Sequence, residues 1–196
     1  MSNWEVAMQH GLLQVLTYGD VGQANWASVS EWMQTENGWN SQHLVGTSPI
    51  ASRAVMLCRQ MEAIHNSLHY SYQNFFQQKN KFSKRVFGSI DQSFSNQQYY
   101  LKEYAYFYLQ KSTKSSVIVD CSIDILPADK NNVGDLLLFL NQQRSICFCQ
   151  AEQITVDNLT LQLLNKRYHT AGLFRYRQIY ICRQQGEIVG CSIVYR

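Results

Sequence analysis

The chain has 196 residues, which suits one large domain or two small ones. Hydrophobic residues make up 45% and aromatic residues 13%, a composition that argues against a disordered chain. The formal net charge of +3 is too small to indicate nucleic-acid binding. No apolar run approaches the roughly twenty residues of a membrane span. Residues 1–20 lack a basic start and an apolar core, so we expect a cytoplasmic protein with reduced cysteines.

The first forty residues, 1–40, are expected to form an N-terminal helical segment. Residues 4–18 carry apolar side chains at helical spacing. Residues 25–34 predict a second, shorter helix, for which Asn25 is a plausible cap. Residues 36–40 contain Asn and Gly and are typical of a loop.

Residues 41–110 are expected to form a helix–strand–helix–strand unit. The clearest helix pattern in the chain covers residues 49–64, because Ser48 is a candidate N-cap and Pro49 fits the first helical position. The remaining elements expected here are a strand at 72–78, a helix at 80–90 and an aromatic-rich strand at 99–109.

A polar stretch at residues 111–116 is the best linker candidate, and residues 117–196 are expected to form a second unit. This unit should read strand, helix, helix, hairpin. The pattern predicts a strand at 117–126, a helix that begins after Asp129, a short apolar piece of undetermined type at 146–150, and a helix at 158–168 between Asp157 and Gly172.

The last twenty residues, 177–196, carry the clearest strand signal. Two β-branched, apolar runs are separated by a short polar break that contains Gly186. This pattern predicts a β-hairpin, which we expect to lie inside a larger sheet.

The second unit resembles the front half of the GNAT-like acetyltransferase superfamily. Residues 123–140, IDILPADKNNVGDLLLFL, look like its first strand and helix, and residues 179–194, IYICRQQGEIVGCSIV, look like its second and third strands. In the first unit, residues 75–90, FFQQKNKFSKRVFGSI, resemble a later strand and helix of that superfamily. The resemblance implies an α/β fold with a mixed sheet. Three arrangements fit this resemblance. The chain could consist of two acetyltransferase-like half-domains, or of one permuted domain with a single mixed sheet, which we prefer slightly. It could also be a fragment of a longer protein.

The resemblance also implies a cofactor site. Gly46, Thr47 and Ser48 precede the long helix where such proteins place a phosphate-binding loop, and a helix N-terminus binds pyrophosphate well. The expected cofactor is acetyl-CoA or another acyl-CoA. The alternative is an ordinary capped helix. Phe87 stands where many members carry a tyrosine that acts as the general acid, so that proton donor would be lost.

These features lead to an N-acyltransferase-like protein that binds an acyl-CoA or acyl-carrier thioester. The alternative is a non-catalytic acetyltransferase-like module that binds a protein or small-molecule partner. A homodimer is a further expectation, and nucleic acid is not an expected partner. Cys147 and Cys149 would point to one side of an extended segment, but no matching pair of ligands is evident, so no metal is expected.

Overall fold

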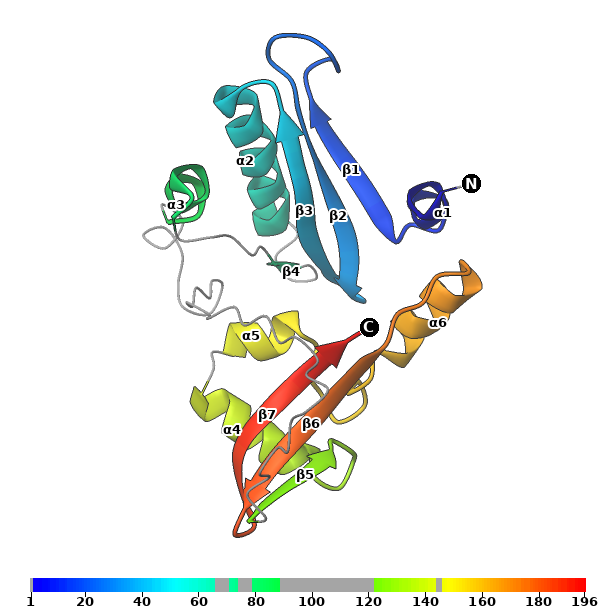
Figure 1. Cartoon of the computed structure of the whole chain (residues 1–196), viewed down its shortest axis with the longest axis vertical. Coiled ribbons are helices and arrows are strands. Elements are labelled where there is room, and N and C mark those ends of the chain that lie inside the picture. Colours follow the sequence, from blue (N-terminus) through cyan, green and yellow to red (C-terminus); the bar gives the residue numbers. More distant parts are fainter. Residues whose placement is uncertain (1, 66–70, 74–78, 89–121, 144–145) are drawn as a thin grey trace, which may run out of the picture.

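The structure is a computed structural model that describes residues 2–65, 71–73, 79–88, 122–143 and 146–196. Figure 1 shows two sheets with helices packed on them. In chain order, the described elements are α1 (Asn3–Gln9), β1 (Leu13–Tyr18), β2 (Ala27–Thr35), β3 (Gly38–Gly46), α2 (Pro49–His65), β4 (Ser71–Gln73), α3 (Lys81–Gly88), β5 (Ile123–Pro127), α4 (Val133–Gln143), α5 (Ile146–Ala151), α6 (Gln162–Thr170), β6 (Arg177–Gln184) and β7 (Glu187–Tyr195). None of these helices combines the length and the apolar character that a membrane crossing requires.

The described strands form two separate sheets. In the first sheet β1, β2 and β3 are antiparallel neighbours, and β4 pairs with β3 in parallel after the crossover through α2. The second sheet has the order β5-β6-β7 and is antiparallel throughout. The fold is therefore mixed α/β, as expected. However, the preferred arrangement with a single mixed sheet is wrong for the described strands.

The expected helical segment at residues 1–40 is also wrong in its main part. Only α1 is helical, and it ends where Gly11 adopts a positive φ of 63° and turns the chain into β1. Residues 25–34 form most of β2 rather than a helix, and the expected loop at 36–40 is only a two-residue turn before β3 begins. Strand pairing with distant residues has overridden the local helical spacing here.

The long helix was predicted correctly. The helix α2 begins at Pro49, and the N–H of Ala51 donates a hydrogen bond of 3.1 Å to Oγ of Ser48, so Ser48 is the N-cap. The helix α3 lies within the expected range 80–90. The strand β4 covers only the start of the strand expected at 72–78, and its remainder, the aromatic strand at 99–109 and the linker at 111–116 lie outside the described residues.

The second unit follows the expected order with local corrections. The strand β5 covers the described end of the strand expected at 117–126, of which residues 117–121 lie outside the described residues. The helix α4 begins at Val133, so Asp129 forms the preceding turn and does not cap the helix. Residues 146–150 belong to the helix α5. Because α5 is helical, Cys147 and Cys149 do not share one side of an extended segment. Asp157 does not cap the next helix, since α6 begins after Leu161.

The C-terminal hairpin is confirmed. Its strands pair from Gln184 with Glu187 at the turn to Arg177 with Tyr195. Gln185 and Gly186 both have positive φ, 53° and 86°, which is the conformation of a type I′ turn. The hairpin also lies in a larger sheet, because β5 pairs with the other edge of β6.

The two units pack through α6, which lies next to the first sheet (Figure 1). One core cluster combines side chains of α1, β1, β2 and β3 with Leu161, Leu164 and Tyr168 from the region of α6. The hydroxyl of Tyr168 donates a hydrogen bond of 2.9 Å to the carbonyl of Met33 in β2. Arg175 donates to the same carbonyl at 3.2 Å. These buried contacts hold the second unit on the first.

Candidate functional site

The predicted cofactor residues lie together at the end of β3. Gly46 is the last residue of β3, and Thr47 and Ser48 connect it to the N-terminus of α2. The strand, loop and helix belong to a crossover that returns to the same sheet as the parallel strand β4. The three residues therefore connect a strand to a helix N-terminus, and whether they bind a phosphate stays a prediction.

Close packing makes glycine necessary at position 46. A Cβ atom built there would lie 2.8 Å from the Cβ of Ala27 and 2.9 Å from Oγ of Ser52. These distances are shorter than ordinary carbon contacts, so any side chain would push the start of α2 away from β2. Gly46 therefore sets how closely the helix N-terminus approaches the sheet.

Thr47 ties the loop to the connection between β1 and β2. Its hydroxyl accepts a hydrogen bond of 3.0 Å from the N–H of Trp26 and lies within 3.1 Å of the carbonyls of Gln23 and Ala24. The N–H of Thr47 donates to the carbonyl of Trp26 at 2.9 Å. This side chain holds the loop in place and is not directed at a ligand.

The N-terminus of α2 carries an uncompensated positive dipole end. No acidic residue lies in its first turn, where such residues usually offset the dipole, and the nearby Arg53 is exposed. The N–H groups of Ala51 and Ser52 are bonded to Ser48. Among the described residues, the N–H groups of Ser48 and Ile50 have no acceptor. An anion at this helix end could therefore accept two hydrogen bonds.

The parallel pairing next to this helix is short. Within the described residues, β4 pairs only with Gly38, Trp39 and Asn40 at the start of β3. The β4-side edge of β3 from Ser41 to Gly46 thus has no described strand partner. Its backbone groups lead from the middle of the sheet to the loop at Gly46.

Phe87 is buried. It is 9% exposed and belongs to the core cluster that α2 and α3 form with β2. A phenyl ring in this position packs the helix and carries no transferable proton.

A buried ion pair lies beneath α2, and sequence reasoning missed it. Glu31 of β2 is fully buried and contacts Arg59 of α2. The other hydrogen-bond donors to the Glu31 carboxylate are the amide of Gln14 at 3.2 Å and the hydroxyl of Ser41 at 3.0 Å. Arg59 also contacts the carboxylate of Glu62 on the same helix. Because these charges neutralise one another between the helix and the sheet, we interpret the pair of Glu31 and Arg59 as a structural link between α2 and β2.

A second buried charge organises the segment after α5. The guanidinium of Arg177 is completely buried and donates to three backbone carbonyls, at 2.9 Å to Leu159, at 2.5 Å to Asn158, and also to Glu152. Burial lowers the pKa of Arg177, while Tyr195 and Glu152 oppose that shift. One side chain on β6 thereby fixes residues 152–159, which have no regular secondary structure after α5.

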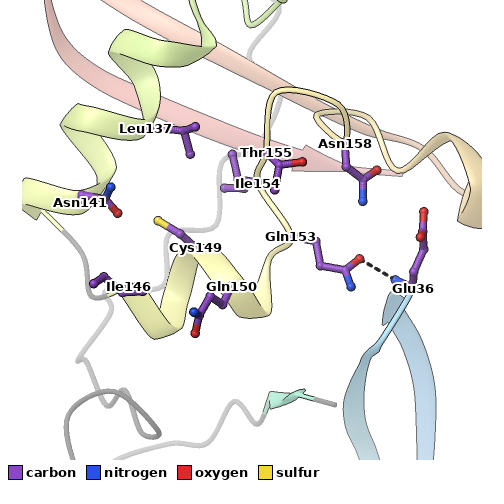
Figure 2. A pocket seen from close by; sticks show the side chains of 10 residues that line it. All are labelled: Glu36, Leu137, Asn141, Ile146, Cys149, Gln150, Gln153, Ile154, Thr155 and Asn158. Carbon is purple, nitrogen blue, oxygen red and sulfur yellow. Dashed lines mark hydrogen bonds between the residues drawn. The ribbon is translucent and has the colours of Figure 1, made fainter. Parts of the chain in front are cut away.

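That fixed segment forms one wall of a pocket of about 510 Å³ (Figure 2). The other walls come from α4, α5 and the turn between β2 and β3. The lining residues are Glu36, Leu137, Asn141, Ile146, Cys149, Gln150, Gln153, Ile154, Thr155 and Asn158. Burial, and secondarily the neighbouring Cys191 and Glu152, raises the pKa of the Cys149 thiol, so this thiol is protonated and poorly nucleophilic.

The chain matches no protein-family model, no curated protein and no solved structure. Function must therefore be argued from the residues themselves. In the described part of the chain, no group of three His, Cys, Asp or Glu side chains is placed to hold a metal ion.

Proposed function

We propose that this chain is an N-acyltransferase-like protein that binds an acyl-CoA or acyl-carrier thioester at the N-terminus of α2. The observation that carries the proposal is the helix end after Gly46. There, the N–H groups of Ser48 and Ile50 have no acceptor among the described residues, and the first turn has no acidic side chain. A phosphate or pyrophosphate group supplies the negative charge and the acceptors that this helix end lacks.

The path from the loop along β3 supports the same ligand. An extended pantetheine arm would hydrogen-bond, as a strand does, to the edge of β3 from Ser41 to Gly46, for which the described residues include no strand partner on the β4 side. In acyl transfer, an amine attacks the thioester carbonyl and the thiol leaves. The protein accelerates this reaction mainly by holding both reactants together and by placing a backbone N–H near the developing oxyanion.

The order of elements in the second unit is consistent with the same proposal. The expected strand, two helices and hairpin correspond to β5, α4, α6 and then β6 with β7, and α5 is an additional helix between α4 and α6. The sheet order β5-β6-β7 places the first of these strands beside the second. This order supports an acetyltransferase-like half-domain beside the first unit.

The test uses Ser48→Asp in the full chain. Aspartate is as good an N-cap as serine, so the helix should keep its stability, but its carboxylate would repel a phosphate. Calorimetry should show coenzyme A bound at least about tenfold more weakly by this variant, and uncharged pantetheine bound equally by both proteins. The matched control is Ser2→Asp at the N-cap of α1, which should bind both ligands like the unchanged protein.

The proposal fails if the unchanged protein shows no heat and no thermal stabilisation with coenzyme A, since a bound ligand must raise stability. It also fails if Ser48→Asp and Ser2→Asp bind coenzyme A equally well.

The second candidate is a non-catalytic module that binds a ligand or partner without acyl transfer. The burial of Phe87 in the helix–sheet core favours it, because the usual proton donor is missing there. Release of free thiol from acetyl-CoA in the presence of amines separates the two candidates. Binding without thiol release selects the module, and release above the uncatalysed rate selects the enzyme.

A further inference from the structure

The pocket between α4, α5 and the β2–β3 turn is separate from the proposed thioester site. Glu36 precedes β3, whereas Gly46 ends it, and a strand of nine residues spans roughly 27 Å. The pocket has a volume of about 510 Å³, within the usual range for small-molecule sites. An inference about its ligand therefore goes beyond the proposed function and can succeed or fail independently of it.

Figure 2 shows both apolar and polar side chains around the pocket. The apolar side chains are Leu137 from α4, Ile146 and Cys149 from α5, and Ile154 from the following segment. Amides dominate the polar side chains. Among the described lining residues these are Asn141, Gln150, Gln153 and Asn158, and Thr155 adds a hydroxyl.

Glu36 gives the pocket its charge. It is the acidic residue among the ten described lining residues, and none of the ten is basic. Within the described parts of the chain, no Lys, Arg or His forms an ion pair with its carboxylate. Burial keeps the Cys149 thiol protonated by raising its pKa, so this thiol adds no charge. The side chains that line the pocket therefore carry one negative charge, although the whole chain carries a net charge of +3.

The polar wall is held rigidly before any ligand arrives. Arg177 fixes the carbonyls of Glu152, Asn158 and Leu159, as described above. The side-chain oxygen of Gln153 accepts a hydrogen bond of 3.0 Å from the N–H of Glu36, which joins the two units at the pocket (Figure 2). A preformed wall reduces the entropy that a ligand loses on binding.

Gln153 occupies an unusual backbone position for its residue type. The N–H of Gln153 bonds to the carbonyl of Gln150, and that of Ile154 bonds to the carbonyl of Cys149, which is the pattern of a Schellman motif. Gln153 is the residue with positive φ, 49°, where glycine is usual. A glycine would relieve this strain but would remove the amide from the pocket. The retained side chain is consistent with a role in the pocket wall.

We propose that this pocket binds a small organic monocation, a primary amine with a compact apolar body. The ammonium group lies at the carboxylate of Glu36 and donates to the surrounding amide oxygens. The apolar body packs against Leu137, Cys149 and Ile154. A carboxylate ligand would meet like charge at Glu36, and a polar ligand without an apolar body would leave the apolar side in contact with water.

Three probes of the same shape test the charge requirement. They are 2-phenylethylamine as the cation, 2-phenylethanol as the neutral analogue and phenylacetate as the anion, each titrated into the full chain by calorimetry. The amine should bind about tenfold more tightly than the alcohol, because a charge-assisted hydrogen bond replaces a neutral one, and phenylacetate should bind weakest.

Two variants assign the binding to this pocket. Glu36→Gln should bring the amine to the affinity of the alcohol and leave the alcohol unchanged, while the fold is retained because the Glu36 N–H is kept. Its matched control, Glu187→Gln at the exposed hairpin turn, should behave like the unchanged protein. Ile146→Ala, at a position that is 57% exposed, should weaken the amine and the alcohol by the same factor.

The proposal is overturned if phenylacetate binds as tightly as the amine, or if Glu36→Gln and Glu187→Gln have equal effects. Absence of heat with all three probes at millimolar concentration overturns it as well. None of these three results bears on coenzyme A binding, which is measured separately with the variant at Ser48.

Discussion

Replacement of Arg177 by methionine should destabilise the second unit strongly. Methionine fills a similar apolar volume, but it has no donor for the carbonyls of Glu152, Asn158 and Leu159. The hydrogen bonds to Glu152 and Leu159 are buried, and the one to Asn158 is partly buried. An unsatisfied buried carbonyl costs at least about 1 kcal/mol, so we expect the free energy of unfolding to fall by about 3 kcal/mol.

The assay is urea denaturation followed by two probes. All four tryptophans lie between residues 4 and 39, so tryptophan fluorescence reports the first unit, whereas far-ultraviolet circular dichroism reports both. Because Tyr168 and Arg175 bond to β2, we expect both probes to shift together in the variant. A shift in circular dichroism alone would show that the contacts to β2 do not couple the units.

The matched control is Arg183→Met on the same strand. Arg183 forms an ion pair of 2.6 Å with Asp135, but both side chains are partly exposed. Such a pair contributes less than about 1 kcal/mol, so this variant should remain close to the unchanged protein. Equal losses for Arg177→Met and Arg183→Met would refute the reasoning, because the three carbonyls would then be satisfied by water.

Two further predictions concern buried groups. Arg59→Met should lower the free energy of unfolding by about 3 kcal/mol, since it leaves the buried carboxylate of Glu31 without its charged partner. Glu31→Gln should lower it less, because Arg59 keeps its contact with Glu62, and the double variant should lose less than the sum of the two. Additive losses in chemical denaturation would contradict this. The raised pKa of Cys149 means that the folded state holds the thiol proton more tightly than the unfolded state. The contribution of this thiol to the free energy of unfolding is therefore complete below the pKa of the unfolded state, about 8.5. It is lost as the pH rises through the pKa of the folded state. Stability measured from neutral to alkaline pH should decline less steeply in Cys149→Ala than in the unchanged protein, whereas Cys58→Ala, at an exposed position, should leave the slope unchanged.

Local signals were sufficient where one residue type satisfies a nearby backbone requirement. Ser48 caps α2 three residues ahead of the N–H that it accepts from, and Gly186 supplies the positive φ that the hairpin turn requires. The loop at Gly46 to Ser48 was placed by the same kind of reasoning. The sequence does not predict which residues pack against this loop. Ala27, for example, belongs to β2, and the local pattern of its segment predicts a helix.

Neither the pocket nor the burial of Arg59 and Arg177 could be predicted without the tertiary structure. Glu36 and Gln153 are separated by 117 positions in the chain, and only the packing of the two units brings them close enough to form a hydrogen bond. The unusual position of Gln153 could in principle be noticed in the sequence, since a helix end without glycine or asparagine is unusual. That requires knowing that residues 146–150 form a helix, which the sequence does not show.

The sequence by itself determined the C-terminal hairpin and the long capped helix, because each depends on residues a few positions apart. The tertiary structure decided that residues 25–34 are a strand. Along β2 every second residue is buried, namely Ala27, Val29, Glu31, Met33 and Thr35, and Ser30 is buried as well. Glu31 breaks this pattern in the sequence because its charge is neutralised by Arg59 on α2, and Trp32 breaks it because Trp4 of α1 packs edge-on against its ring at 6.1 Å. Partners that are distant in the chain allow β2 to bury a charged side chain and to place an aromatic ring on its other face. The spacing of apolar residues along the sequence does not reveal these partners.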